Sequence, residues 1–217
     1  MRVALFGGSF DPPHLGHVAI ARAAADRFAL DQVLFAPVGL QPLKPQAAGA
    51  TFDERLAMTT LACLNDLRFI PSTIDAARPD GLPNYTVDTL RLLHEAMPDA
   101  QILNLIGADS FLSLARWRSP DRLLELAEWI VVSRPGYSQS GLLADPPGLT
   151  LTSAQRKRIH VLDTVHEDVA ATNLRERLRA GDPCKDLLQP QVSSYIQHHH
   201  LYLESKGDES WAPGHRH

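Results

Sequence analysis

Two histidines, His14 and His17, stand three residues apart at the predicted start of a helix, shortly after the glycine pair Gly7-Gly8. This spacing directs both imidazoles from one end of the helix, beside backbone N–H groups that lack a partner within the helix. Such a helix start attracts anions, and Gly8 and Gly16 remove bulk that would block their approach. The combination predicts a pocket for a phosphate chain.

A strand, a turn and a helix position these groups. Residues 3–6 are a short apolar run, typical of a strand that is buried on both faces. Apolar residues then recur at helical spacing from Val18 to Phe28, and a second apolar strand follows at 32–36. This βαβ unit implies a right-handed crossover and a parallel sheet, whose ligands bind beyond the carboxyl ends of its strands.

Three charged residues follow later predicted strands on the same side. Lys44 is the only charge in a loop rich in proline and glycine after the second strand, although it could equally be a solvated loop lysine. Asp109 follows a strand over 101–106, where a carboxylate commonly accepts from sugar hydroxyls. Arg134 follows a strand over 129–132. These positions predict a polar crevice along one edge of the sheet.

Capping residues predict where the later helices start. Thr51 and Glu54 form a capping box, and Thr86 is a plausible N-cap of a helix that reaches Met97. Thr172 is a good N-cap for another helix, in which Arg175 adds positive charge near the start and so favours an incoming anion. The alternative for Arg175 is a surface salt bridge to Glu176.

The remaining segments predict further elements and one ambiguous aromatic residue. Strands are predicted over 69–74 and 160–162, and a final helix over 190–199. Trp117, flanked by two arginines, could pack on a short helix or stack on a planar ring.

Length and composition describe an ordinary globular protein. The chain has 217 residues, of which 44% are hydrophobic and 21% charged, with a formal net charge of −4. We expect a single domain over residues 1–202, a flexible tail over 203–217 and a cytoplasmic location. The charge gives no reason to expect a nucleic-acid partner, and the sequence contains no long apolar segment that would predict a membrane partner. Cys63 and Cys184 lack metal-ligand spacing and fit structural roles in a reducing compartment.

Several motifs together resemble those of the bacterial nicotinate-nucleotide adenylyltransferases, a family of the nucleotidylyltransferase superfamily. The resemblance runs from residue 2 to about residue 202, and its motifs are Gly7-Gly8-Ser9-Phe10-Asp11-Pro12, His14 to His17, Tyr85 to Leu90, Gly107-Ala108-Asp109, Trp117-Arg118 and Arg134-Pro135-Gly136. It implies an α/β fold: a Rossmann-like, doubly wound parallel sheet with helices on both faces.

The same resemblance implies a reaction and the residues that serve it. ATP and nicotinate mononucleotide would give deamido-NAD and pyrophosphate in NAD biosynthesis, by direct in-line attack without a covalent enzyme intermediate. Mg²⁺ would be bound mainly by the ATP phosphates, with no metal-ligating residues assigned. The implied catalytic residues are His14, His17, Lys44 and Arg175. The implied substrate-binding residues are Gly7, Gly8, Ser9, Phe10, Thr86, Asp109, Trp117, Arg134 and Thr172.

Two departures from the family pattern keep alternatives open. Leu43 stands where the family has a histidine before Lys44, and Ala170 and Ala171 stand where it has two serines. The alternatives are another small-molecule nucleotidylyltransferase, such as one acting on phosphopantetheine, and a nucleotide-binding sensor with weakened catalysis. The sequence also leaves a homo-oligomer open.

Overall fold

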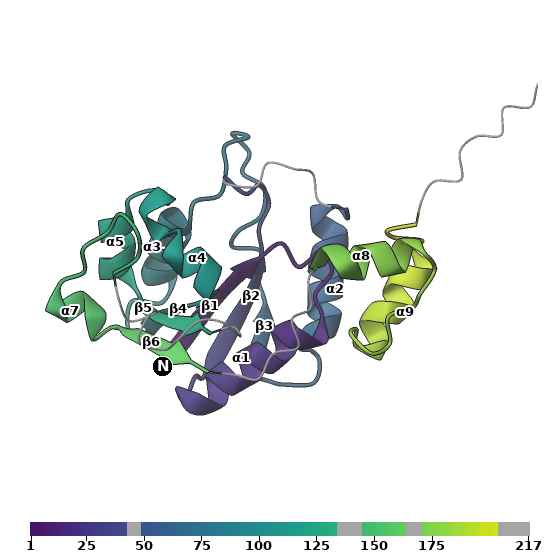
Figure 1. Cartoon of the computed structure of the whole chain (residues 1–217), viewed down its shortest axis with the longest axis horizontal. Coiled ribbons are helices and arrows are strands. Elements are labelled where there is room, and N and C mark those ends of the chain that lie inside the picture. Colours follow the sequence, from purple (N-terminus) through teal and green to yellow (C-terminus); the bar gives the residue numbers. More distant parts are fainter. Residues whose placement is uncertain (43–48, 134–144, 164–170, 204–217) are drawn as a thin grey trace, which may run out of the picture.

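A computed structural model describes residues 1–42, 49–133, 145–163 and 171–203, which form a parallel sheet with helices on both faces (Figure 1). Its six strands run in the order β3-β2-β1-β4-β5-β6, and every neighbouring pair is parallel. The strands are β1 Arg2–Gly8, β2 Gln32–Pro37, β3 Phe69–Pro71, β4 Gln101–Gly107, β5 Glu128–Val132 and β6 Ile159–Leu162. The predicted doubly wound parallel sheet is therefore confirmed.

Helices connect the successive strands along the described chain, and α8 and α9 follow the last strand. They are α1 Leu15–Arg27, α2 Phe52–Cys63, α3 Thr86–Ala96, α4 Ala108–Leu112, α5 Pro120–Leu126, α7 Ser153–Arg156, α8 Ala171–Arg179 and α9 Pro190–His198, with a 3₁₀ turn at Leu114–Arg116. None of the helices in the described ranges combines the length and apolar character needed to cross a membrane.

The core has two halves, one on each face of the sheet. Ala4 and Phe6 of β1 point into the half formed with α1, α2, α8 and α9. Val3 and Leu5 point into the half formed with α3, α4 and α5. Because successive side chains of a strand alternate between faces, β1 has to be apolar at every position, which explains its uninterrupted hydrophobic run.

The strand order fixes where a ligand can bind. The chain winds outward from β1 in one direction through β2 and β3, and in the other through β4, β5 and β6. A crevice forms beyond the carboxyl ends of strands at such a switch point, here between β1 and β4. The glycine turn after β1 and Asp109 after β4 both lie at this edge.

Three sequence predictions are wrong in detail. The strand predicted over 69–74 ends at Pro71: Ser72 N donates to Phe35 O of β2 over 2.8 Å, and the chain then turns, with Ala76 N donating to Thr73 O over 2.9 Å. Thr86 is the first residue of α3 instead of its N-cap, which is Tyr85. Thr172 likewise lies within the first turn of α8, which begins at Ala171. Residues 204–217, most of the predicted tail, lie outside the described residues.

Candidate active site

His14 and His17 come together at the start of α1. Their ring centroids are 3.7 Å apart, and the backbone N of His14 donates to Nδ1 of His17 over 3.2 Å. Nδ1 of His17 is thus an acceptor, so in the neutral ring the proton belongs on Nε2. Gly16 makes this pairing possible, because a Cβ at that position would lie 3.0 Å from Nδ1 of His14.

The imidazole of His17 is not the freely exposed group that a helix start suggests. It is half-buried, and its ring centroid lies 5.0 Å from that of Phe10 and 6.0 Å from that of Phe6. This packing restricts the ring to a small range of orientations. A donor held in this way needs little reorganisation when charge develops nearby.

The backbone amides of the same helix start are less available than the sequence predicts. Leu15 N donates to Leu187 O over 2.8 Å, and His17 N donates to His14 O over 3.0 Å. The first contact comes from the segment before α9, which could not be anticipated from local sequence. The histidine side chains therefore carry more of the anion-binding capacity than the helix amides do.

The turn after β1 exposes its backbone and buries its aromatic residue. Gly7 and Ser9 are exposed and Gly8 is half-buried. Phe10, another of the predicted substrate-binding residues, is only 1% exposed, and its ring packs against that of His17. Any substrate contact of Phe10 must therefore use its backbone, whereas its side chain supports the imidazole.

Arg175 reaches the same turn from the far end of the chain. Its Nη1 donates to the backbone O of Asp11 over 2.9 Å and lies 3.8 Å from Oδ2 of Asp11. The alternative of a salt bridge to Glu176 is wrong, since the only ion pair of Arg175 among the described residues is with Asp11. The structure thus brings Arg175 into the neighbourhood of His14 and His17 without any help from sequence proximity.

The remaining predicted site residues are described only in part. Asp109 is exposed in the first turn of α4, directly after β4. Trp117 is half-buried, and its ring packs edge-on against Trp129 with 6.4 Å between the centroids. Its Nε1 donates to Ser113 Oγ over 3.3 Å, so the indole packs within the protein, as the first of the two alternatives describes. Lys44 and Arg134 lie outside the described residues.

A cavity of about 140 Å³ lies where the chain enters α3. Asp75 lines it, is 7% exposed and accepts a hydrogen bond from the hydroxyl of Thr89. Burial raises the pKa of the Asp75 carboxyl, because a charged carboxylate loses its hydration there. The second carboxylate of the cavity, Asp88, has Nη1 of Arg78 3.8 Å from its Oδ2. Both effects reduce the negative charge that an anionic ligand would meet.

Two residues that the sequence analysis left without a role hold the strand ends together. Arg55 of α2 is 3% exposed and donates from Nη1 to Ser9 O over 2.7 Å and from Nη2 to Val38 O over 2.9 Å. It thereby joins the loops after β1 and β2. Asp11 lies within the motif at residues 7–12, but only its long-range contacts reveal its importance.

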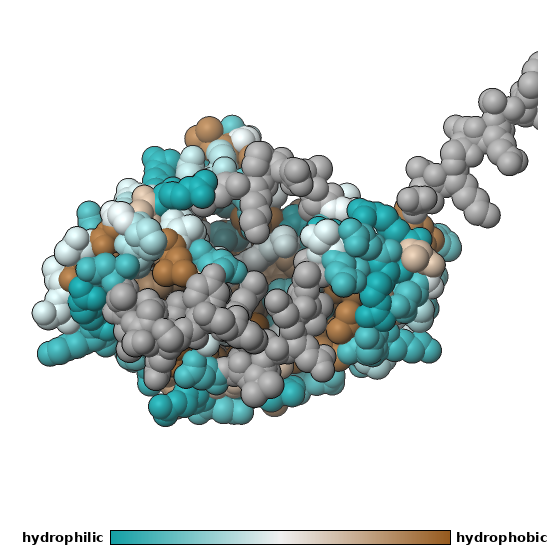
Figure 2. Space-filling model, viewed as in Figure 1, coloured by the Kyte–Doolittle hydropathy of each residue, from teal (hydrophilic) through white to brown (hydrophobic). Residues whose placement is uncertain are grey.

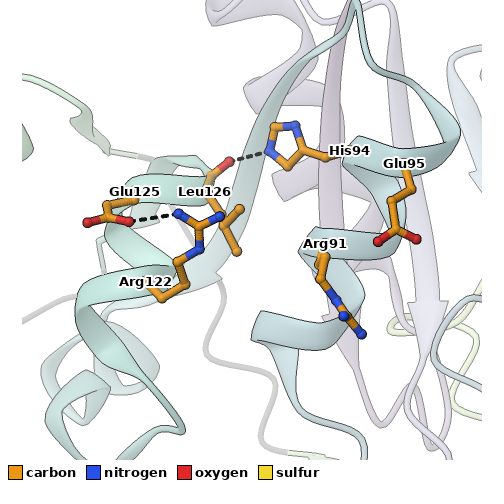
Figure 3. A pocket seen from close by; sticks show the side chains of 6 residues that line it. All are labelled: Arg91, His94, Glu95, Arg122, Glu125 and Leu126. Carbon is orange, nitrogen blue, oxygen red and sulfur yellow. Dashed lines mark hydrogen bonds and ion pairs between the residues drawn. The ribbon is translucent and has the colours of Figure 1, made fainter.

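A larger pocket, of about 410 Å³, lies elsewhere (Figure 3). It lies between α3 and α5, and its lining residues are Arg91, His94, Glu95, Arg122, Glu125 and Leu126. His94 points across it to the carbonyl of Leu126, with 2.6 Å between Nε2 and O. His94, Glu95, Glu125 and Leu126 lie at the carboxyl ends of the helices that precede β4 and β5, so the pocket lies toward the amino edge of the sheet, away from the crevice.

The surface is hollowed at the middle of the face seen in Figure 2, between the α3 to α5 side and the α8 to α9 side.

Within the described ranges, no group of three or more His, Cys, Asp or Glu side chains could hold a metal ion. Around the turn after β1, the Asp11 carboxylate accepts from Gly49 N, Ala50 N and the Tyr202 hydroxyl. The imidazoles of His14 and His17 and the guanidinium of Arg175 are groups that suit phosphate oxygens.

Comparison with known proteins places the chain in a family. The family model described as cytidylyltransferase-like matches residues 5–177. A probable nicotinate-nucleotide adenylyltransferase of Gloeobacter violaceus is 42% identical over 204 residues, which are 93% of this chain and 96% of that protein. A probable nicotinate-nucleotide adenylyltransferase of Corynebacterium kroppenstedtii is 37% identical, covering 94% of this chain and 92% of that protein.

A solved structure agrees with the fold. The nicotinic acid mononucleotide adenylyltransferase of Plasmodium falciparum, complexed with NaAD, matches with a TM-score of 0.71 at 15% identity, covering 93% of this chain and 97% of that one. At this identity the match supports the fold alone. The sequence relatives and the family model lead to one conclusion: the chain belongs to the nicotinate-nucleotide adenylyltransferases, within the cytidylyltransferase-like family.

Proposed function

We propose that this chain transfers AMP from ATP to nicotinate mononucleotide, giving deamido-NAD and pyrophosphate by direct in-line attack. The observation that carries the proposal is the convergence of His14, His17 and Arg175 on the turn after β1, at the switch point of the sheet. Relatives up to 42% identical over nearly the whole chain carry the name of this activity.

The chemistry asks for positioning and charge stabilisation. The phosphate of the mononucleotide already carries a nucleophilic oxygen, so no enzyme nucleophile and no covalent intermediate are needed. The site has to align that oxygen with the α-phosphorus of ATP and to stabilise charge that develops on the phosphates. His14, His17, Arg175 and Lys44 supply the donors and positive charge for this task. Asp109 would accept from a nucleotide ribose, and Arg134 would bind the phosphate of the mononucleotide.

Mg²⁺ is assigned to the triphosphate itself. A Mg²⁺ ion bound there would supply charge neutralisation for the phosphate oxygens.

The entrance to α3 favours an anionic acceptor, the nicotinate form, over the nicotinamide form. Free N–H groups at the start of a helix satisfy a carboxylate, whereas an amide NH₂ would face other donors. The two carboxyl groups of the cavity repel an anionic acceptor only weakly, because the pKa of Asp75 is raised and Asp88 lies beside Arg78. Arg118, stacked 4.6 Å from the ring centroid of Tyr85, adds positive charge at this entrance.

The expected outcome is a turnover efficiency with nicotinate mononucleotide that exceeds that with nicotinamide mononucleotide about 10²-fold, since each unmatched buried donor costs about 1–3 kcal/mol. Pyrophosphate release is measured at saturating ATP and Mg²⁺ with both mononucleotides and with phosphopantetheine. Preference for phosphopantetheine would assign another transferase activity. Nucleotide binding without pyrophosphate release from any acceptor would assign a sensor.

Replacing Arg175 by alanine is expected to raise the KM for ATP about 10- to 100-fold, because a hydrogen bond to a charged group contributes about 1.5–3 kcal/mol. The KM for nicotinate mononucleotide should stay within about twofold, since the proposed partner of Arg175 is the triphosphate. Arg179→Ala is the matched control, because Arg179 is an exposed arginine at the end of the same helix. Unchanged ATP kinetics in Arg175→Ala would remove the guanidinium from ATP binding.

A further inference from the structure

The side chain of Asp11 joins three parts of the chain that are far apart in sequence. It is 4% exposed and accepts from Gly49 N over 2.7 Å, from Ala50 N over 3.1 Å and from the hydroxyl of Tyr202 over 2.7 Å. A buried carboxylate needs such donors to compensate for lost hydration. Because it accepts three of them, the orientation of its carboxylate plane is fixed.

Asp11 also holds one nitrogen atom of the Arg175 guanidinium. Its Nη1 donates to the backbone O of Asp11, while Oδ2 lies 3.8 Å away, beyond a direct hydrogen bond. In the described part of the chain, the remaining N–H groups of Arg175 have no protein acceptor. This arrangement orients the guanidinium while leaving most of its donors for an incoming anion. Figure 1 shows α8, which carries Arg175, beside the loop that follows β1.

Tyr202 is built tightly into this cluster. It is 8% exposed, and its ring lies so close to Gly49 that a Cβ there would be 2.9 Å from its Cε1. Burial raises the pKa of its hydroxyl, with the charge of Asp11 adding to the effect, so the group stays a donor. Its backbone φ of 65° is left-handed, a conformation that a non-glycine residue keeps only where its surroundings enforce it.

We propose that Tyr202 is a positioning residue for ATP binding: its hydroxyl occupies Oδ1 of Asp11 and so keeps the Asp11 carboxylate from capturing Arg175. The proposal rests on the proposed function, in which Arg175 binds the triphosphate. Without the hydroxyl, Oδ1 loses a donor in a buried site. The nearest cation able to replace it is Arg175, already within 3.8 Å of the same carboxylate. A closed Asp11–Arg175 salt bridge would withdraw the guanidinium from ATP.

Tyr202→Phe is expected to weaken ATP binding about 10-fold, in proportion to the loss of one charged hydrogen bond from Arg175. The dissociation constant is measured with ATP and Mg²⁺ in the absence of acceptor, well below the melting temperature of the variant. The KM for ATP should rise equally, while the KM for nicotinate mononucleotide stays within about twofold. Tyr195→Phe is the matched control, because Tyr195 of α9 is half-buried and its hydroxyl makes no hydrogen bond to the described residues.

A double-mutant cycle separates positioning from mere stability. If Tyr202 acts through Arg175, Arg175→Ala/Tyr202→Phe should bind ATP as weakly as Arg175→Ala alone, with no further loss. A purely structural tyrosine would instead lower the melting temperature and leave ATP binding equal to that of Tyr195→Phe, which would overturn the proposal. A further loss in the double variant, equal to that in Tyr202→Phe alone, would also overturn it.

The binding measurement distinguishes this proposal from the proposed function. ATP affinity does not depend on which acceptor the enzyme uses. If the wild type forms no deamido-NAD while Tyr202→Phe still weakens ATP binding through Arg175, the choice of acceptor is wrong and the positioning role stands. If the wild type forms deamido-NAD and Tyr202→Phe binds ATP normally, the proposed function stands and the positioning role of Tyr202 is wrong.

Discussion

Replacing His17 by alanine is expected to lower kcat about 10²- to 10³-fold, the loss typical when one preorganised donor to a transition-state charge is removed. The bond from His14 N to Nδ1 of His17 fixes the tautomer and so assigns Nε2 as the donor. Packing against Phe10 holds the ring in place. The KM for ATP should change much less than kcat. Steady-state pyrophosphate release at saturating substrates measures the effect.

The packing of His17 requires a control for stability. Alanine removes ring contacts with Phe10 as well as a donor, so part of the effect could come from a loosened turn. His17→Phe keeps a ring of similar size without its nitrogen atoms, and should lose kcat as severely as the alanine variant. His160→Ala removes an imidazole of β6 that pairs with Glu128 of β5, and should keep kcat within about twofold. A His17→Phe enzyme with near-normal turnover would exclude His17 from the chemistry.

Replacing Asp11 by alanine is expected to lower the free energy of unfolding by about 3 kcal/mol or more. The change leaves three donors without their acceptor, at about 1–3 kcal/mol for each buried group. It also leaves Arg55 and Arg175 without the nearby negative charge that offsets theirs. Equilibrium denaturation in urea measures the loss, with an unchanged slope indicating that unfolding remains two-state.

Asp31→Ala is the control for this prediction. Its exposed carboxylate accepts one backbone hydrogen bond, from Arg2 N over 2.6 Å. Because water can replace that acceptor, its removal should change the free energy of unfolding by less than about 1 kcal/mol. Equal losses in the Asp11 and Asp31 variants would show that the Asp11 cluster does not anchor the loops and the C-terminal segment.

The sequence predicts the sheet well because its strands are short apolar runs buried on both faces. The first βαβ unit, the strand ending at Ile106 and the capping box at Thr51 all agree with the structure to within a few residues. The weak points are elements set by context. α5 and α7 are too short to show a periodicity, and β3 stops early because the chain turns over 73–76, where Ala76 N donates to Thr73 O.

The candidate site was predictable where it depends on local order along the chain. His14 and His17 lie on one helix turn, and Asp109 directly follows a strand, so their placement follows from spacing and topology. The contacts of Asp11 with Tyr202 and Arg175 span 191 and 164 residues, and no periodicity encodes such separations. The burial of Phe10 and the use of Leu15 N by Leu187 are missed for the same reason.

The most direct test of the proposed reaction follows one oxygen atom. Nicotinate mononucleotide carrying ¹⁸O in its phosphate is incubated with the wild-type protein, ATP and Mg²⁺, and the products are analysed by mass spectrometry. If the mononucleotide oxygen attacks the α-phosphorus of ATP in line, deamido-NAD retains all of the label and the pyrophosphate contains none. Label in the pyrophosphate, or the absence of deamido-NAD under conditions where ATP binds, would contradict the proposed function.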